Sequence, residues 1–171
     1  MGFNARKEGD LMRVRKYQMR DTDAMMAIWN GVVEEGNAFP QEEPLDASDT
    51  DAFFASQSYC GVAVDFAANV HGLYILHPNN EGRCGHICNA SFAVAPDSRG
   101  QKVGEDLVKD CIVQAGKLGF KILQFNAVVT SNEAANKLYE KLGFNRLGTI
   151  PGGFRLKDGS FADINLYYIN L

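Results

Sequence analysis

Hydrophobic side chains recur at three- and four-residue steps in three stretches of the chain, a spacing that predicts amphipathic helices. These stretches cover residues 21–36, 99–118 and 130–143, and a glycine ends or follows each of them. Thr130 and Glu133 match the Thr-x-x-Glu capping box, which predicts a helix start there. A further short helix is expected over residues 48–56, after a proline-containing loop at residues 37–46.

Strand-like runs alternate with these helices. They are expected over residues 11–17, 59–66, 70–77, 86–95, 120–129, 145–150 and 162–169. The run at residues 120–129 is apolar on both faces, as in a central strand covered by helices on both sides. The last two runs flank a turn rich in glycine and proline. The order β-α-α-β-β-β-α-β-α-β-β predicts a mixed α/β sheet.

The length of 171 residues fits one domain, assigned to residues 11–171, after a polar arm at residues 1–10 that is expected to be flexible. A formal net charge of -4 and a pI near 5.4 argue against nucleic acid as a partner, because that partner requires a basic surface. No apolar run reaches the ~20 residues of a membrane span, and the first residues contain no signal-peptide core. We therefore expect a cytoplasmic protein with neither nucleic-acid nor membrane partners.

Cys60, Cys84, Cys88 and Cys111 indicate reduced thiols, since no signal peptide precedes them. The segment Cys84-Gly85-His86-Ile87-Cys88 contains three side chains of the metal-binding type. A tetrahedral site needs a fourth ligand, however, and no second close pair of Cys or His follows at zinc-finger spacing. We expect no metal, and small buried strand residues at these positions instead.

The segment from Val94 to Gly104 joins a strand end to a helix start. Backbone N–H groups at such a junction are unpaired, and together with the helix dipole they form a site for an anion such as a pyrophosphate. Gly100 and Gly104 permit a close approach to the backbone. An ordinary strand-to-helix turn is the alternative interpretation.

This segment resembles the cofactor signature of the GNAT superfamily of N-acetyltransferases. Residues 99–104, Arg-Gly-Gln-Lys-Val-Gly, are similar to the pattern Arg/Gln-x-x-Gly-x-Gly/Ala, with Lys102 in place of the middle glycine. Lys102 either crowds the loop or offers its ammonium group to a phosphate. The resemblance implies that Val94 pairs through its backbone with the pantetheine arm of acetyl-CoA. It also implies that the pyrophosphate is held by Arg99, Gly100, Gln101, Lys102, Val103 and Gly104.

Residues 131–144, Ser-Asn-Glu-Ala-Ala-Asn-Lys-Leu-Tyr-Glu-Lys-Leu-Gly-Phe, resemble the second signature of the superfamily, Asn-x-x-x-x-x-Leu-Tyr-x-Lys-x-Gly-Phe. The two signatures together imply the GNAT fold, a mixed and mostly antiparallel central sheet flanked by helices on both faces. They imply an acetyl-CoA-dependent N-acetyltransferase in which Asn132 contacts the cofactor and Tyr139 protonates the departing thiolate. A core tyrosine with a satisfied hydroxyl is the alternative for Tyr139.

Two narrower likenesses concern the acceptor. Residues 83–92, 99–104 and 125–130 are similar to the fungal azetidine-2-carboxylate acetyltransferases, which implies an acceptor pocket lined by Asn89, Phe92 and Asn126. Residues 28–36 are similar to the phosphinothricin acetyltransferases, in which a glutamate aligns with Glu34. Glu34 is therefore a candidate to attract the acceptor ammonium or to take its proton through water, and a solvated glutamate at a helix end is the alternative. We expect a small amine as acceptor, an amino acid or an amino-acid analogue.

Direct transfer in a ternary complex is the expected mechanism. Neither Cys88 nor Cys111 has a sequence signature for an activating base nearby, which argues against a covalent acyl-cysteine. A protein or peptide N-terminal acetyltransferase and a non-catalytic acyl-CoA-binding domain are the alternative functions. A homodimer is expected by analogy alone.

Overall fold

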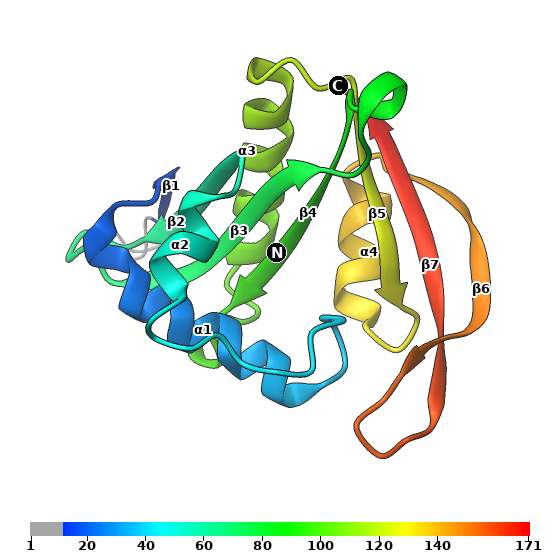
Figure 1. Ribbon diagram of the computed structural model, residues 1–171, viewed down its shortest axis with the longest axis horizontal. Coiled ribbons are helices and arrows are strands. Elements are labelled where there is room, and N and C mark those ends of the chain that lie inside the picture. Colours follow the sequence, from blue (N-terminus) through cyan, green and yellow to red (C-terminus); the bar gives the residue numbers. More distant parts are fainter. Residues whose placement is uncertain (1–11) are drawn as a thin grey trace, which may run out of the picture.

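The computed structural model describes residues 12–171, so the expected arm at residues 1–10 and the start of the first expected strand lie outside the described residues. Seven strands form one sheet in the order β1-β2-β3-β4-β5-β7-β6 (Figure 1). Neighbouring strands are antiparallel, except that β4 and β5 run parallel. The strands are β1 (Arg13–Lys16), β2 (Tyr59–Val64), β3 (Val70–Pro78), β4 (Ile87–Val94), β5 (Ile122–Val129), β6 (Asn145–Arg155) and β7 (Phe161–Asn170).

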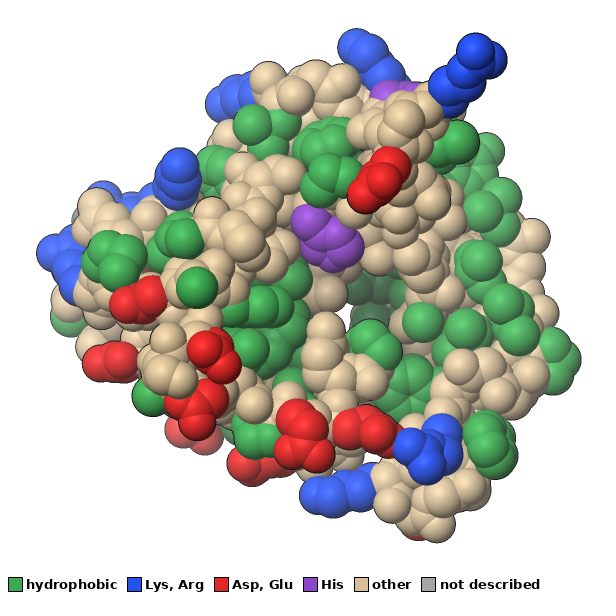
Figure 2. Space-filling view, viewed as in Figure 1, with side chains coloured by type: hydrophobic (Ala, Val, Ile, Leu, Met, Phe, Trp, Pro, Cys, Tyr) green, Lys and Arg blue, Asp and Glu red, His purple; other side chains and the backbone are tan. Residues whose placement is uncertain are grey.

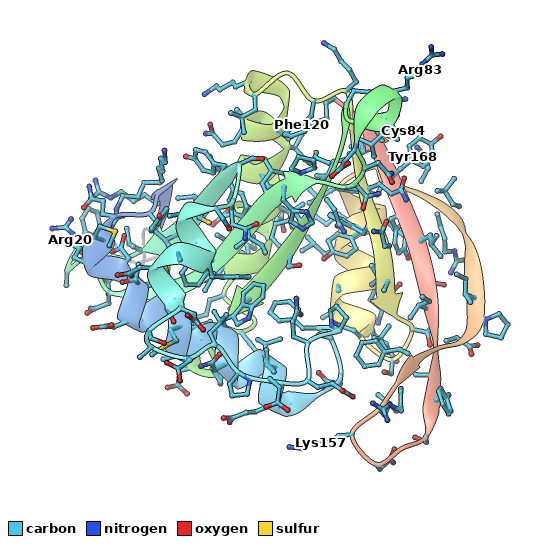
Figure 3. All side chains as sticks on the ribbon, in the orientation of Figure 1. Arg20, Arg83, Cys84, Phe120, Lys157 and Tyr168 are labelled. Carbon is cyan, nitrogen blue, oxygen red and sulfur yellow. The ribbon has the colours of Figure 1, made fainter. Side chains whose placement is uncertain are left out.

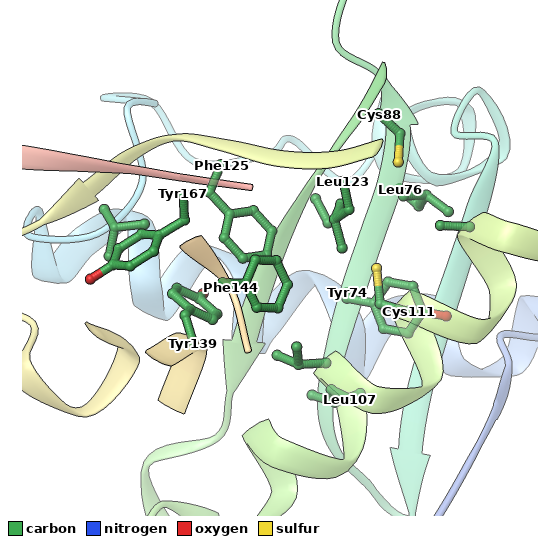
Figure 4. Packing of buried hydrophobic residues seen from close by; sticks show 14 of the residues in the cluster. Tyr74, Leu76, Cys88, Leu107, Cys111, Leu123, Phe125, Tyr139, Phe144 and Tyr167 are labelled. Atoms are coloured by element: carbon green, nitrogen blue, oxygen red, sulfur yellow. The ribbon is translucent and has the colours of Figure 1, made fainter. Parts of the chain in front are cut away.

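Helices cover both faces of the sheet, as Figure 1 shows. They are α1 (Thr22–Glu35), α2 (Thr50–Ala55), α3 (Val103–Lys117) and α4 (Glu133–Lys141), with short 3-10 turns η2 (Met19–Asp21), η3 (Gly82–Cys84) and η4 (Pro96–Ser98). Trp29 of α1 and Phe54 of α2 belong to one buried cluster, and Leu107 of α3 and Tyr139 of α4 to another (Figure 4). The expected mixed, mostly antiparallel α/β sheet is confirmed.

Each face of the sheet has its own apolar core. Trp29 is only 1% exposed and packs against Phe39, with ring centroids 4.3 Å apart. Truncation of such a buried ring typically costs about 3–5 kcal/mol of the free energy of unfolding. Gly36 ends α1 with φ of 66°, which lets its N–H donate to the carbonyls of Val32 and Val33 before the chain turns away.

The two parallel strands β4 and β5 separate soon after they begin. They pair only at Ile87 with Ile122 and at Cys88 with Leu123, and the rest of β4 has β3 as its only strand neighbour among the described residues. Figure 1 shows the two strands diverging toward the middle of the molecule. The edge of β4 after Cys88 therefore presents backbone groups that no strand satisfies.

Two expected helix starts are wrong. α3 begins at Val103 rather than at residue 99, because Gly100 and Lys102 adopt left-handed backbone conformations with φ of 77° and 66°. The expected capping box at Thr130 does not form, because the Asn132 side chain caps α4 by accepting from the Ala135 N–H at 3.2 Å.

Two expectations about the second half of the sheet also need correction. β5 is not apolar on both faces, since Asn126 is exposed and Gln124 is only half-buried. β6 does not end at residue 150 but continues to Arg155 through the Pro-Gly-Gly segment, with an irregularity in its pairing between Ile150 and Phe154. As an edge strand, β6 tolerates a proline that no central strand would accept. No helix among residues 12–171 is long and apolar enough to cross a membrane.

Candidate active site

A pocket with a volume of about 220 Å³ lies where β4 and β5 diverge. In the space-filling view of Figure 2 this part of the molecule is hollowed. None of its lining side chains is charged. The wall comes from β4, β5, α4 and the loop after α1, through Ala38, Phe39, Pro40, Asn89, Ala90, Ser91, Phe92, Phe125, Asn126, Ala127, Val128, Val129, Asn132, Ala135 and Tyr139.

Tyr139 reaches this pocket from α4. Its ring packs against Phe125, with centroids 4.5 Å apart, and is 9% exposed (Figure 4). Among the described residues its hydroxyl has no hydrogen-bond partner, and it is not one of the fully buried unpaired atoms. The fold therefore leaves this hydroxyl unpaired in a residue that lines the pocket. Burial raises the pKa of Tyr139 well above its usual value, so the group stays protonated at neutral pH.

Three residues expected to bind the acceptor, Asn89, Phe92 and Asn126, line the same pocket. Asn126 Nδ2 donates to Asn79 Oδ1 at 2.6 Å, and Asn126 Oδ1 accepts from Gln124 Nε2 at 3.0 Å. Asn89 Oδ1 accepts from the N–H of Ala90 at 2.8 Å. The protein thus fixes the orientation of both amides at the pocket wall. The two hydrogen-bond partners of Asn126, Asn79 and Gln124, were not predicted from the sequence.

Two of the side-chain hydrogen bonds that hold the loop between β4 and α3 are exposed to solvent. Arg99 Nη2 donates to Glu35 Oε1 at 2.6 Å, and Gln101 Nε2 donates to the Asp97 carbonyl at 2.8 Å. Lys102 is exposed and left-handed, so its side chain does not press into the protein. Gly100 is exposed as well, and a Cβ built on it would have no neighbour within 4 Å.

The start of α3 has the features that an anion site requires. No side chain caps this helix, so the N–H groups of its first turn are open to a ligand. The Val103 side chain is buried in the core, which leaves only its backbone for the ligand. A Cβ on Gly104 would meet Val94 Cγ2 at 3.8 Å and Leu138 Cδ2 at 3.9 Å, which are ordinary contacts. Packing leaves the space beside Gly100 and Gly104 open, although the positive φ of Gly100 favours glycine there for conformational reasons. Open backbone at a helix start is the kind of site that an anion can occupy.

Asn132 lies at the pocket wall and at the start of α4 at once. A polar network beneath it ties α4 to the sheet. Asn136 Nδ2 donates to the carbonyls of Val129 and Asn132, and Asn136 Oδ1 accepts from Asn165 Nδ2 at 2.8 Å and from the Tyr167 hydroxyl at 2.9 Å. Because Asn165 is 4% exposed, satisfying its amide matters for stability. Sequence reasoning missed this network, since nothing local connects residues so far apart in the chain.

Glu34 lies elsewhere. It lines a second pocket of about 550 Å³ between the end of α1 and the β6–β7 hairpin, together with Glu42, Arg155 and Lys157. Lys157, labelled near the hairpin tip in Figure 3, donates to the Glu34 carbonyl at 2.9 Å. The structure thus does not bring Glu34 and Tyr139 into one pocket. The two pockets share Phe39 and Pro40 from the loop after α1.

The cysteines take no part in either pocket. Cys60, Cys88 and Cys111 are buried, and Cys84 is exposed in η3 (Figure 3). Burial raises the pKa of Cys88 to about 12 and that of Cys111 well above its usual value, which disfavours the thiolate that an acyl carrier needs. Within residues 12–171, no three side chains of His, Cys, Asp or Glu gather where a metal ion could bind.

The diverging parallel strands β4 and β5 thus lie in one sheet with the β4 edge that leads into the uncapped start of α3. The model of the acetyltransferase (GNAT) family matches residues 24–144, so the chain belongs to this family. N-acetyltransferase aca1 of Schizosaccharomyces pombe is 30% identical over 157 residues, covering 81% of this chain and 74% of that protein. A GCN5-related N-acetyltransferase from Kribbella flavida has a TM-score of 0.86 at 32% identity, covering 94% of this chain and 98% of its own.

A further relative is an L-methionine sulfoximine/L-methionine sulfone acetyltransferase of Pseudomonas aeruginosa, 25% identical over 164 residues, covering 92% of this chain and 94% of that protein. Solved structures with the same fold contain acetyl-CoA. The protein is therefore an acetyltransferase of the GNAT family.

Proposed function

We propose that the protein transfers the acetyl group of acetyl-CoA to the amine of a small amino acid or amino-acid analogue. The observation that carries this proposal is the pocket of about 220 Å³ in which Asn89, Asn126 and Tyr139 face a common space. Its volume suits a small molecule, whereas a peptide acceptor needs an open groove. The Pseudomonas aeruginosa relative supports the acceptor class, since its name specifies amino-acid analogues.

Transfer is direct, in a ternary complex. The neutral amine attacks the thioester carbonyl, a C–N bond replaces the C–S bond, the nitrogen loses one proton and the sulfur gains one. Tyr139 gives that proton to the sulfur, which is the role its unpaired, protonated hydroxyl fits. Holding both reactants in place contributes about 7–11 kcal/mol in well-oriented systems, so positioning outweighs the acid.

The cofactor lies along the open edge of β4, in this proposal, with Val94 pairing through its backbone. Its diphosphate rests on the backbone of Arg99, Gly100, Gln101, Lys102, Val103 and Gly104, with Asn132 nearby. Support comes from the unpaired strand edge, the uncapped α3 start and the open space at Gly100 and Gly104. The acceptor binds Asn89, Phe92 and Asn126 from the opposite side of the pocket.

Glu34 receives the amine proton through water, from the neighbouring pocket across Phe39 and Pro40. The loop at residues 37–46, whose Phe39 and Pro40 line both pockets, acts as a lid over the acceptor. A homodimer belongs to the same proposal. Its support is β6, an edge strand whose Leu147 and Ile150 are 59% and 48% exposed and would be covered by a second copy.

A screen of acceptors tests this proposal. Acetyl-CoA turnover is measured with amino acids, proline analogues, methionine sulfoximine and peptides with free N-termini. Turnover of the amino-acid-like amines, but not of the peptides, is the expected result. Turnover of peptides alone would instead assign the protein N-terminal acetyltransferase function, and acetyl-CoA binding without any turnover would assign a non-catalytic domain.

A further inference from the structure

A serine, a histidine and an aspartate are hydrogen-bonded in series beside the cofactor loop. His71 Nδ1 lies 2.8 Å from Ser98 Oγ, and His71 Nε2 lies 3.1 Å from Asp65 Oδ2. The three residues come from different elements, namely the β2–β3 turn, β3 and η4. They line neither pocket, and nothing in the transfer reaction described above uses them.

This series does not serve as a nucleophilic triad. Ser98 is 3% exposed, so its hydroxyl cannot reach an acyl group without a rearrangement of the loop. A nucleophile must also lie next to the reacting carbonyl, and Ser98 is not at the wall of the Tyr139 pocket. The series must therefore act through what Ser98 holds in place.

The hydrogen positions follow from the aspartate. Asp65 accepts from the Asn69 side chain at 2.9 Å and from the Asn69 N–H at 2.9 Å, and these bonds, with that from His71, lower the pKa of Asp65 to about 2. An ionised carboxylate only accepts, so His71 Nε2 carries a hydrogen. Nδ1 of a neutral ring then accepts from Ser98, and Nδ1 of a charged ring donates to it.

Ser98 immediately precedes the residues that hold the diphosphate. Among side chains 97–102 it is the buried one, whereas the ties of Arg99 and Gln101 are solvent-exposed. The same strand anchors the loop a second time, because the His71 carbonyl accepts from the Ala95 N–H at 2.9 Å. Gly72 lies next to His71, and a Cβ there would meet Val103 Cγ1 at 3.1 Å, so β3 also packs tightly under the start of α3.

We propose that Asp65, His71 and Ser98 are positioning residues that hold the loop at residues 99–102 in the shape that binds the diphosphate of acetyl-CoA. The inference rests on the cofactor placement under Proposed function. It adds an anchor through the buried Ser98 to a loop whose Arg99 and Gln101 hydrogen bonds are exposed. Loss of the Ser98 hydroxyl should weaken the binding of the diphosphate and leave the binding of the pantetheine arm unchanged.

The test is a calorimetric titration of Ser98→Ala and His71→Gln with two probes, acetyl-CoA and S-acetylpantetheine, which lacks the diphosphate. We expect the Kd for acetyl-CoA to rise about fivefold, the equivalent of ~1 kcal/mol for one hydrogen bond, while the Kd for S-acetylpantetheine stays constant. Ser98→Thr retains the hydroxyl and should restore affinity. His77→Gln, on the same strand but outside both pockets, is the matched control and should change neither Kd.

An equal rise in Kd for both probes would show that the residues have a general structural role. No rise in Kd for either probe would show that they have no role in binding. Each of these results would overturn the inference. His71→Gln decides the question if Ser98→Ala does not fold, because the His71 side chain is 24% exposed and tolerates change better. Gly104→Asp separates this inference from the cofactor placement. If Gly104→Asp weakens acetyl-CoA binding and the other variants do not, only the positioning role fails. If Gly104→Asp also has no effect, the placement itself fails.

Discussion

Two tyrosines, Tyr139 and Tyr167, lie with ring centroids 5.8 Å apart but differ in what their hydroxyls do. The Tyr167 hydroxyl donates to Asn136 at 2.9 Å and lies 3.1 Å from Glu140 Oε1, whereas that of Tyr139 has no partner among the described residues. A hydroxyl that contributes to the fold is expected to be satisfied. The contrast therefore supports a chemical role for Tyr139 rather than a structural one.

Tyr139→Phe tests that role at the scale of one atom. The ring packing is retained, so the melting temperature should hold, while kcat should fall by about 10²–10⁴-fold, the usual contribution of a general acid. Steady-state kinetics with saturating acetyl-CoA measures this change. Tyr59→Phe, on β2 and outside the pocket, is the control. If kcat is unchanged in Tyr139→Phe, the Tyr139 hydroxyl has no catalytic role and the residue serves only in core packing.

The position of a residue at the pocket could be predicted where a sequence motif includes that residue. It could not be predicted where the residue's partners are far away in the sequence. The motif residues Asn132 and Tyr139 do line one pocket, together with Asn89 and Asn126. By contrast, Ser98 and His71 are 27 positions apart, and no local pattern couples them. The second pocket around Glu34 was also not foreseen, since it depends on how the β6–β7 hairpin meets α1.

In helix α4, one residue, Asn132, is both the N-cap of the helix and part of the pocket wall. Its Oδ1 caps the helix, and in the proposed cofactor placement its Nδ2 is the group that contacts acetyl-CoA. Asn132→Asp keeps an accepting oxygen, so the melting temperature should be nearly unchanged while affinity for acetyl-CoA falls. Asn132→Ala removes the cap as well and should cost about 1 kcal/mol of the free energy of unfolding.

Thermal melts and acetyl-CoA titrations of both variants measure these effects. If Asn132→Asp binds acetyl-CoA like the wild type, the residue is a cap and nothing more.

In the loop before α3, the sequence leaves two roles open for Lys102: it either crowds the loop or offers its ammonium group to a phosphate. Its φ of 66° costs a non-glycine residue about 1–2 kcal/mol, partly offset in Lys102→Gly by the larger entropy of glycine in the unfolded chain. We expect Lys102→Gly to gain up to about 1 kcal/mol in stability. Its affinity for acetyl-CoA should fall several-fold, because an exposed ammonium near the phosphates is lost. Tighter binding of acetyl-CoA by Lys102→Gly would mean that Lys102 crowds the ligand.

Element types followed the hydrophobic pattern, and element boundaries did not. Helical spacing predicted α1, α3 and α4 because each helix packs an apolar face against the core, although in α4 only Tyr139 is fully buried. The start of α3 was misplaced because backbone strain at Lys102 has no signature in composition. The sequence predicts a β5 covered on both faces, but the structure leaves Asn126 at the wall of the pocket that the divergence from β4 creates.

For the whole molecule, two carboxylates link stability to pH. Hydrogen bonds from Lys109 and Lys141 lower the pKa of Glu105 to about 2, and those from Asn69 and His71 do the same for Asp65. Since both pKa values are depressed in the folded state, their contribution is complete above about pH 4.5 and is lost as the pH falls toward 2.

Urea unfolding between pH 6 and pH 3 should show this decline, and Glu105→Gln should reduce its slope. A slope identical to that of the wild type would exclude a contribution from Glu105.

The sheet is nearly divided in two, because β4 and β5 share only the pairs at Ile87 and Cys88. A cofactor lying along the open edge of β4 would take the place of a strand there and connect the two halves of the sheet. The amides of β4 and β5 should then become protected from hydrogen exchange in concert when acetyl-CoA binds, although the ligand touches only part of them. Without a ligand, the two halves of the sheet would move relative to each other where β4 and β5 separate. Binding of acetyl-CoA would then fix the pocket in the shape that the acceptor binds.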